Sequence, residues 1–410
     1  MRLKISFAIA AAAFALSAAA QPMTYARFNQ LVAERNASYL AEKYNIDNAE
    51  ASLQAARVFN DPELSVAYGN NQDWNLQMGQ SLEVGLSIDP DLAGVRRARI
   101  AVALSEKDIS EASAAAFFSN LKMEAASAWA QAWKLRESCA LLEKSVADMQ
   151  RLAQSDSLRL ALGDIGRADA LQSRLEARTM KGSLLALQAD YENALDALSL
   201  LCGGEPIESI EGELFCPDAL PDEGEICSLA EANRADLKAA MLSKKLSENN
   251  LRLVRASRAF ELGIDLGYSY NTEVRNEIAP APKFNGLSAG VRIPIKFSSF
   301  NKGEMNAARA EVRQSEAYYE AARLQVRSEA TQAYNSFVSS IAVLHQYEAS
   351  ILDDAATVVN GRREGYLRGE SSLVEYLSAQ QTYLEVMQAY IEARCNCFVC
   401  HARLMQAVGD

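Results

Sequence analysis

The sequence predicts a mainly α-helical protein with a small β part, built from two tandem structural repeats. Two long stretches contain no proline, one between Pro90 and Pro206 and one after Pro294, and their composition favours very long helices. Upstream of each stretch lie two short runs in which apolar and polar residues alternate, as in strands. Glycine pairs of equal spacing recur in both stretches: Gly163/Gly203 and Gly369/Gly409.

The repeats set the expected domain organisation. We expect a signal peptide at 1–20, a first repeat at 21–204, a linker at 205–230 and a second repeat at 231–410. Each repeat begins with a helix, continues with a strand hairpin and ends in a long antiparallel helical hairpin. The strand hairpins are predicted at 61–90 and 260–297, and the helical tips near 163–167 and 369–372.

The N-terminus is typical of a secretory signal peptide. Arg2 and Lys4 give a basic start, and the charge-free apolar run Ile5–Ala20 ends in small residues before Gln21. This run is somewhat short for a spanning helix, and no later apolar run reaches the roughly 20 residues that such a helix needs. We therefore expect an exported protein without a transmembrane helix.

Composition excludes several function classes. An apolar fraction of 49% excludes a disordered chain, and a formal net charge of −12 argues against a nucleic-acid partner. The acidic balance fits an acidic channel or surface, and it equally fits simple solubility. With two histidines and neither a glycine-rich phosphate loop nor a nucleophile elbow, we expect no enzyme and no cofactor.

The helical stretches are expected to form hairpins. About 68 helical residues between Gly94 and Gly163 would span roughly 100 Å, and the stretch from Gly303 to Gly369 is similar. Gly163 and Gly369 supply the helix-ending conformation, after which Asp164 or Ser371 can cap the next helix. Apolar residues recur every seven positions in the last helix, as in a coiled coil: Leu377, Leu384, Ile391, Phe398 and Met405.

The alternating runs predict strands with one apolar and one polar face. They extend over Leu64 to Gly69, Leu82 to Ile88, Leu262 to Tyr270 and Leu287 to Phe297. The apolar face would pack on a soluble core or face lipid in a membrane barrel, and the adjoining very long helices favour the barrel. Four strands are too few, because about eight is the minimum and lipid does not tolerate open edges. The barrel interpretation therefore requires several chains to pool their strands.

Seven cysteines leave at least one thiol free if the others pair. Cys216 and Cys227 flank a segment rich in proline and acid and are placed to close a small loop, although connectivity cannot be deduced from sequence. Cys139 and Cys202 are expected to be buried on helices.

Cysteines also crowd the last helix. Cys397-Phe398-Val399-Cys400-His401 matches the haem-attachment pattern, and together with Cys395 its ligands would suit a soft metal. However, Phe398 lies on the heptad seam, and a coiled coil offers no haem pocket. Structural or incidental cysteines are the favoured interpretation.

Local motifs then suggest a family. The segment Gly286–Ile295, followed by Asn301–Ala308, looks like the strand-to-helix junction of the TolC-like outer membrane efflux family, and Gly94–Arg99 is similar to its first-repeat counterpart. Asn233–Leu237 resembles a helix start of that family, with Ala235 in place of its proline. Tyr366–Gln380 looks like its second hairpin tip. Order, spacing and duplication of these motifs extend the resemblance over nearly all of the chain after the signal peptide.

The resemblance implies a homotrimer with a 12-stranded β-barrel in the outer membrane of a Gram-negative bacterium and a long α-helical barrel in the periplasm. Partners would be a periplasmic adaptor (membrane fusion protein), an inner-membrane efflux pump and outer-membrane lipid. The chain would conduct substrates, such as drugs or metal ions, without catalysis. A periplasmic helical-rod scaffold or adhesion protein, with its strands in a soluble sheet, is the alternative.

The resemblance also assigns candidate gate residues. Glu375 and Asp169 occupy positions where family carboxylates surround the periplasmic constriction, and Tyr366 matches a tyrosine that bonds across helices. The chain departs from the family at Ser378, where a second acid is expected, and at Ser371, where an arginine is expected. A ring of carboxylates would favour cations, whereas the competing interpretation is that Glu375 and Asp169 are solvated acids.

The two tip segments, Gly163–Arg167 and Gly369–Ser372, are the expected adaptor contact. The residues assigned to that contact are Gly163, Asp164, Gly369, Glu370, Ser371 and Ser372.

Overall fold

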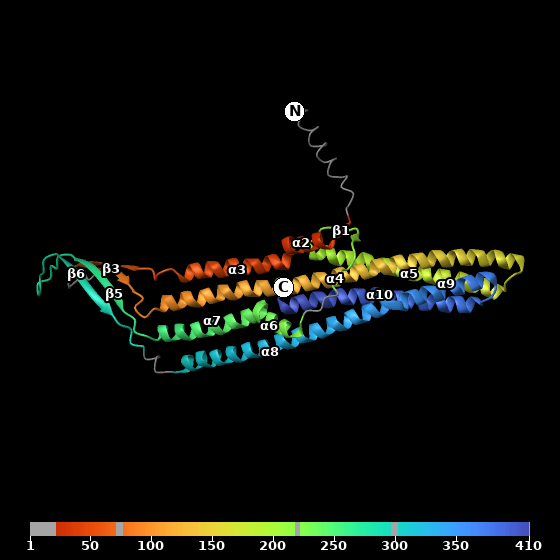
Figure 1. The fold of residues 1–410 in the computed structure, drawn as a ribbon. Helices are drawn as coiled ribbons and strands as arrows, with labels where there is room; N and C mark the ends of the chain where they lie inside the picture. Colours follow the sequence, from red (N-terminus) through yellow and green to blue (C-terminus); the bar gives the residue numbers. More distant parts are fainter. Residues whose placement is uncertain (1–21, 71–76, 218–221, 297–301, 410) are drawn as a thin grey trace, which may run out of the picture. The chain divides into compact units, whose positions relative to one another are not determined.

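The computed structural model describes residues 22–70, 77–217, 222–296 and 302–409. The expected signal peptide at 1–20 lies outside the described residues. The described chain is mainly helical with a small β part, as the sequence predicts (Figure 1).

The chain divides into two compact units. Unit 1 comprises Met1–Glu42, Ala115–Ala235 and Leu324–Asp410, and unit 2 comprises Lys43–Ala114 and Asp236–Arg323. Each unit therefore combines segments of both sequence repeats.

Unit 2 contains parts of four helices that polar contacts join. These helices are α3 (Ala37–Ala56), α4 (Val95–Leu162), α7 (Ala235–Ser257) and α8 (Gly303–Gln346). The buried Asn249 amide donates to the Ser105 hydroxyl at 2.8 Å and so joins α7 to α4. The hydroxyls of Ser247 and Ser315 lie 2.6 Å apart and join α7 to α8. Because buried polar groups need partners, these pairs favour one register of the helices.

Unit 2 also carries an antiparallel sheet, which in the described chain has four strands in the order β2-β3-β5-β6. The strands are β2 (Glu63–Asn70), β3 (Gln80–Ile88), β5 (Gly263–Asn271) and β6 (Phe284–Arg292). The central pairing of β3 with β5 joins the two repeats, with Leu86 opposite Leu266 and Val84 opposite Tyr268. The predicted strand hairpins thus combine into one sheet.

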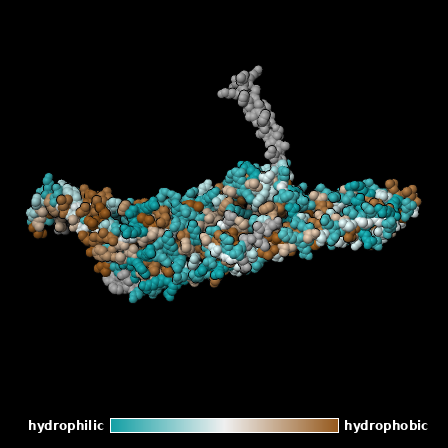
Figure 2. Space-filling view, viewed as in Figure 1, coloured by the Kyte–Doolittle hydropathy of each residue, from teal (hydrophilic) through white to brown (hydrophobic). Residues whose placement is uncertain are grey.

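The two faces of the sheet differ as the alternation predicts. One face carries large apolar side chains that remain exposed, including Leu64, Val66 and Tyr68 of β2 and Leu287 of β6. Figure 2 shows apolar side chains gathered over this part of the molecule. On the other face glycines lie opposite serines of neighbouring strands, as at Gly69/Ser81 and Gly85/Ser65. This face also carries charged residues, among them Asp265 and Arg292, which pair at 3.6 Å.

The last strand ends earlier than predicted. The alternation of residues predicts a strand from Leu287 to Phe297, whereas β6 ends at Arg292. Pro294 explains the difference, because proline has no backbone N–H to donate to a sheet. Phe297 lies outside the described residues.

Unit 1 contains the remaining elements. They are β1 (Met23–Thr24), α2 (Tyr25–Arg35), most of α4, α5 (Arg167–Leu201), β4 (Ile210–Glu211), α6 (Glu223–Asn233), the end of α8, the π-helical turn η2 (Tyr347–Ile351), α9 (Leu352–Arg368) and α10 (Leu373–Val408). β1 and β4 form a short parallel pair. The predicted heptad residues of α10 are all buried or half-buried, as expected of a packing seam.

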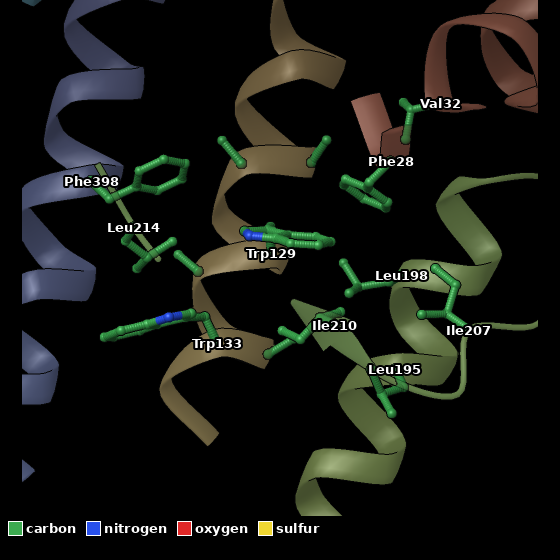
Figure 3. Close-up of a cluster of buried hydrophobic side chains, with 14 of the residues drawn as sticks. Phe28, Val32, Trp129, Trp133, Leu195, Leu198, Ile207, Ile210, Leu214 and Phe398 are labelled. Carbon is green, nitrogen blue, oxygen red and sulfur yellow. The ribbon is translucent and has the colours of Figure 1, made fainter. Parts of the chain in front are cut away.

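The core of unit 1 is aromatic and lies where α2, α4, α5 and α10 meet (Figure 3). Trp129 and Trp133 of α4 are almost fully buried, and Phe28 of α2 lies against Trp129 with ring centroids 5.3 Å apart. Leu198 of α5 and Phe398 of α10 complete the cluster. Large buried aromatic rings of this kind contribute strongly to stability.

Candidate functional site at the helical tips

Both predicted hairpin tips are formed by the same backbone motif. Gly163 after α4 and Gly369 after α9 adopt φ values of 82° and 78°. The N–H of Asp164 donates to the carbonyl of Arg159 at 2.9 Å, and that of Glu370 donates to the carbonyl of Gly365 at 2.8 Å. This six-residue closure is the Schellman motif, in which glycine accommodates the left-handed conformation.

The helix starts after the tips differ from the prediction. The hydroxyl of Ser372, and not that of Ser371, accepts the N–H of Glu375 at 3.3 Å and caps α10. Helix α5 begins after Gly166 without a side-chain cap, so Asp164 does not have the predicted role. Ser371 is half-buried beside Gly365, whereas Gly163, Asp164, Gly369, Glu370 and Ser372 are exposed.

Tyr366 is buried near the second tip. Its hydroxyl donates a 2.8 Å hydrogen bond to the Asp156 carboxylate of α4, and its ring stacks on Tyr376 of α10 with centroids 6.3 Å apart. Burial and the hydrogen bond to Asp156 raise the pKa of Tyr366, and the charge of Asp169 raises it further. Tyr366 is therefore a neutral donor that links the helical hairpins of the two repeats.

The two predicted gate carboxylates are exposed. Asp169 lies on the first turn of α5, where its negative charge interacts favourably with the positive end of the helix dipole. Glu375, on the first turn of α10, pairs with Arg362 of α9 at 3.2 Å, and both side chains are about half exposed. Such a surface pair contributes little to stability. The structure thus keeps both charges available to solvent, while only Tyr366 enters the core.

Sequence reasoning missed Asp156 and Arg159. Asp156 is fully buried, and an Arg159 guanidinium nitrogen lies 3.9 Å from its carboxylate oxygen. A signal was present, because Asp156 continues the apolar stripe of Met149 and Leu152 at helical spacing. A carboxylate at a core position requires a partner, and that partner comes from a distant part of the sequence.

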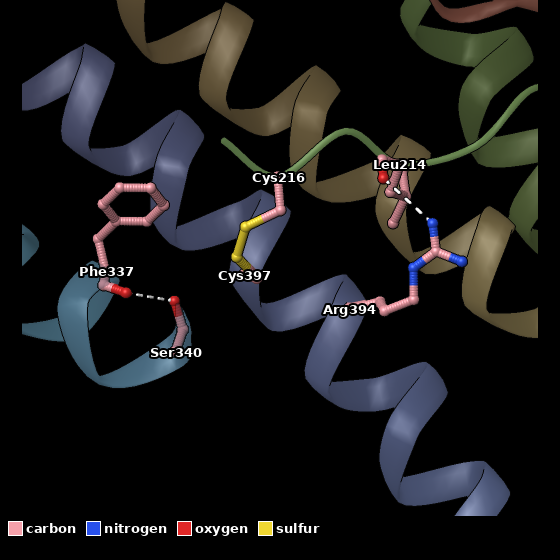
Figure 4. The surroundings of a disulfide bond; sticks show 6 residues. All are labelled: Leu214, Cys216, Phe337, Ser340, Arg394 and Cys397. Carbon is pink, nitrogen blue, oxygen red and sulfur yellow. Dashed lines mark hydrogen bonds between the residues drawn. A yellow bond between two sulfur atoms is a disulfide. The ribbon is translucent and has the colours of Figure 1, made fainter. Parts of the chain in front are cut away.

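The cysteine motif takes a structural role. Cys397 forms a disulfide with Cys216, so the small loop predicted between Cys216 and Cys227 does not form (Figure 4). Cys227 instead lies 3.7 Å from the Thr331 hydroxyl. Because the Cys397 sulfur is already bonded, it cannot also attach a haem through the Cys-x-x-Cys-His pattern. Cys139 and Cys202 are buried, as predicted.

The disulfide anchors a segment that crosses α10. Arg394 of α10 donates to the Leu214 carbonyl at 3.3 Å (Figure 4). It also pairs with Glu213 at 3.0 Å. Arg136 of α4 donates to the carbonyl oxygens of Ile210 and Gly212. The segment 210–216 is thereby held at several points in unit 1.

No helix within the described ranges is both long and apolar enough to cross a bilayer. Among the same residues, no group of three or more His, Cys, Asp or Glu side chains is arranged to hold a metal ion.

The chain is similar in sequence to known outer membrane efflux proteins. A family model described as outer membrane efflux protein matches residues 226–410. The chain is 24% identical over 382 residues to the cobalt-zinc-cadmium resistance protein CzcC of Cupriavidus metallidurans, covering 91% of this chain and 87% of that protein. It is 23% identical over 296 residues to the outer membrane efflux protein BepC of Brucella suis, covering 71% and 63%.

Solved structures share the fold. CusC, described as forming a transmembrane channel, has a TM-score of 0.77 at 17% identity, covering 94% of this chain and 92% of its own. The outer membrane protein VceC of Vibrio cholerae has a TM-score of 0.76 at 17% identity, covering 94% and 96%.

Proposed function

We propose that this chain is a member of the outer membrane efflux protein family and serves as the outer-membrane channel of a tripartite efflux system. Its substrates would pass from an inner-membrane pump and a periplasmic adaptor to the outside of the cell. The role is conduction and not catalysis.

The sheet of unit 2 is the observation that carries the proposal. Its large side chains lie on one face and stay exposed: Leu64 is 68% and Leu287 is 89% accessible. A soluble sheet would cover such a face, whereas lipid solvates it. In the described chain β2 and β6 each pair on one side only, which leaves two edges. Lipid does not tolerate open edges, so further copies must close the sheet.

Three copies would supply twelve strands, which is within the range of membrane barrels. The polar face, with small residues such as Gly69, Gly85 and Ser65 and the charged pair Asp265/Arg292, would then line the lumen. The long helical hairpins would extend into the periplasm. Their tips, Gly163–Arg167 and Gly369–Ser372, which are exposed except at Ile165 and Ser371, would contact the adaptor.

Asp169 and Glu375 are proposed as charges at the periplasmic constriction, with Tyr366 holding the surrounding helices. Their exposure supports this assignment, because a selective ring must present its charge to passing ions. The relative with 91% coverage is named for cobalt, zinc and cadmium resistance. Divalent metal cations are therefore the first substrates to test.

Fractionation tests the proposal. The full chain should be recovered in outer membranes, migrate as a trimer in mild detergent and form ion-conducting pores in a planar bilayer. Recovery as a soluble periplasmic monomer without pore activity would overturn the proposal in favour of a helical-rod scaffold. Deletion of the gene should then sensitise cells to cobalt, zinc or cadmium if metal cations are the substrate, and to drugs if they are not.

A further inference from the structure

We propose that unit 2 binds the phosphate of an anionic phospholipid at the junction between its sheet and its helices. The ligands are Arg96 and Arg99 of α4, and Phe59 and Phe260 form part of the apolar wall for the lipid chains. The membrane as the source of this ligand rests on the proposed channel function, whereas the cavity and its charges do not.

A cavity of about 750 Å³ lies where the sheet joins the helices of unit 2 (Figure 1). Its size is within the range of small-molecule sites. One part of its wall is apolar and accessible, because Phe59, Leu92 and Phe260 are all more than half exposed. Ile88, at the end of β3, continues this wall onto the apolar face of the sheet. The cavity therefore adjoins the surface that lipid covers in the proposed channel.

Arg96 is held in place with one edge of its guanidinium unused. The guanidinium carbon lies 3.8 Å from the centroid of the Phe59 ring, and Nε donates to the Arg57 carbonyl at 2.8 Å. Among the described residues, its two terminal nitrogens have no hydrogen-bond acceptor. These nitrogens present the parallel donors that bind two oxygens of one phosphate. Arg96 is thus prearranged for such a group.

Arg99 adds a second positive charge to the cavity. It lies three positions after Arg96, so both side chains lie on the same side of α4. Arg99 is exposed and forms no ion pair within the described ranges of the chain. The acidic side chains that line the cavity bond to other groups: Asp89 to Arg292, Asp91 to the N–H groups of Val95 and Arg96, and Glu261 to Lys296. Both guanidinium groups therefore remain without an anion.

The start of α4 differs in charge from the start of α8. Its first five residues include Arg96, Arg97 and Arg99, and its first turn contains no acidic residue. Positive charges at this end of a helix oppose the helix dipole. Helix α8 instead has Glu304 in its first turn, which pairs with Arg258 at 3.7 Å. The arginines therefore destabilise the start of α4 unless an anion neutralises them, which favours an external anion in the first repeat.

An amphiphile fits both parts of the cavity. Its phosphate would bind between Arg96 and Arg99, and its acyl chains would lie on Phe59, Phe260 and Ile88. A free phosphate ion would use the arginines alone and leave the apolar wall in water. In the proposed channel this junction lies at the boundary of the apolar band, where lipid headgroups and aromatic side chains gather. The chemistry therefore favours an anionic phospholipid over a soluble anion.

Lipid titration of the purified full chain tests the site. The protein is freed of lipid in mild detergent, and native mass spectrometry measures the binding of phosphatidylglycerol and of zwitterionic phosphatidylcholine. We expect the parent to prefer phosphatidylglycerol and to keep it in the presence of equimolar inorganic phosphate. Arg96→Gln/Arg99→Gln should weaken phosphatidylglycerol binding roughly 25-fold, because each arginine near an anionic lipid contributes about a fivefold factor.

The matched control is Arg309→Gln, which removes an exposed arginine of α8 outside the cavity and should leave the affinity unchanged. Arg99→Gln alone breaks no ion pair or hydrogen bond of the described chain and should weaken binding about fivefold, even if the double variant does not fold. Equal affinity of the parent and Arg99→Gln, equal binding of both lipids, or displacement by equimolar inorganic phosphate would each overturn the lipid site. A parent that binds phosphatidylglycerol in this way but forms no pore would confirm the lipid site and refute the channel function.

Discussion

The two long helices that precede the tips differ in regularity. Helix α4 runs from Val95 to Leu162 without interruption, whereas its second-repeat counterpart is divided by the π-helical turn η2 at Tyr347–Ile351. Such turns are rare and often mark functional positions. The Tyr347 ring lies against Tyr390 of α10, whose hydroxyl donates to Glu348 at 3.2 Å. The irregular helix also carries Tyr366, which donates a hydrogen bond to Asp156 of the first repeat. The second repeat therefore contains both the π-helical turn and the tyrosine that bonds to α4.

Single-residue deletions should separate the two helices most sharply. Deleting Ala349 within η2 removes the extra residue and allows an uninterrupted α-helix. Deleting Glu143, at the same distance from its own tip glycine, rotates the following part of α4 by about 100° and displaces its buried residues. We expect assembled trimer from the first variant and none from the second, as measured by mild-detergent electrophoresis. Equal loss in both would contradict the comparison.

The glycines at the two ends of α5 should respond differently to alanine. Gly163 and Gly203 both have positive φ, which costs about 1–2 kcal/mol for alanine. At Gly163 a Cβ meets nothing within 4 Å, whereas at Gly203 it would lie 2.6 Å from the Arg35 carbonyl oxygen. Gly203→Ala should therefore lower the thermal unfolding midpoint clearly more than Gly163→Ala. Equal shifts of the unfolding midpoint would contradict this prediction, because they would mean that the Arg35 carbonyl moves away from the new Cβ at little cost.

Substituting the acidic residues after the tips should change conduction with little effect on the stability of the fold. Replacing Asp169 and Glu375 together by alanine should raise single-channel conductance and reduce cation selectivity. Stability should change by less than about 1 kcal/mol, because Glu375 forms an exposed pair. Glu364→Ala, which removes an exposed i,i+4 pair with Arg368, is the control. Unchanged conductance and selectivity would leave both carboxylates as solvated helix-face acids.

The smallest expected effect concerns His401 of α10. Burial lowers its pKa, so the folded chain binds a proton less readily than the unfolded chain. Its contribution to stability is complete above the ordinary histidine pKa of about 6.5 and decreases as the pH falls through the lowered folded value. When the pH is lowered from 7 to 5, the thermal unfolding midpoint of the parent should therefore fall slightly more than that of His401→Gln. Parallel pH profiles would contradict this assignment.

Long-period patterns predicted the fold well. The first proline-free stretch contains α4 and α5, the second contains α8, α9 and α10, and the alternating runs form the strands. Both patterns act locally over many residues. The π-helical turn gave no comparable signal, since Tyr347–Ile351 contains neither glycine nor proline. The cap of α10 was misplaced by one residue, because Ser371 and Ser372 are chemically equivalent choices.

Contacts between distant residues were harder to predict. Tyr366 was identified as a bonding residue, but its partner Asp156 depends on how α4 packs against α9. The Cys216–Cys397 pair has the same origin: nearby Cys227 was the simpler expectation, and only the folded chain brings Cys397 to Cys216. The sequence thus indicates which residues are able to bond or pair, but it does not identify the partner that the fold brings to each of them.

The disulfide has a consequence for biogenesis. Its two cysteines are separated by 181 positions, and Cys227 and Cys395 lie between them. In the export that we propose for this chain, Cys216 would emerge well before Cys397, at a stage when Cys227 is the nearer partner. The segment 210–216 can be locked to α10 only after almost the whole polypeptide has been translocated. Under the proposed export, the Cys216–Cys397 bond would form only near the end of translocation, and an earlier Cys216–Cys227 bond would have to be avoided or rearranged.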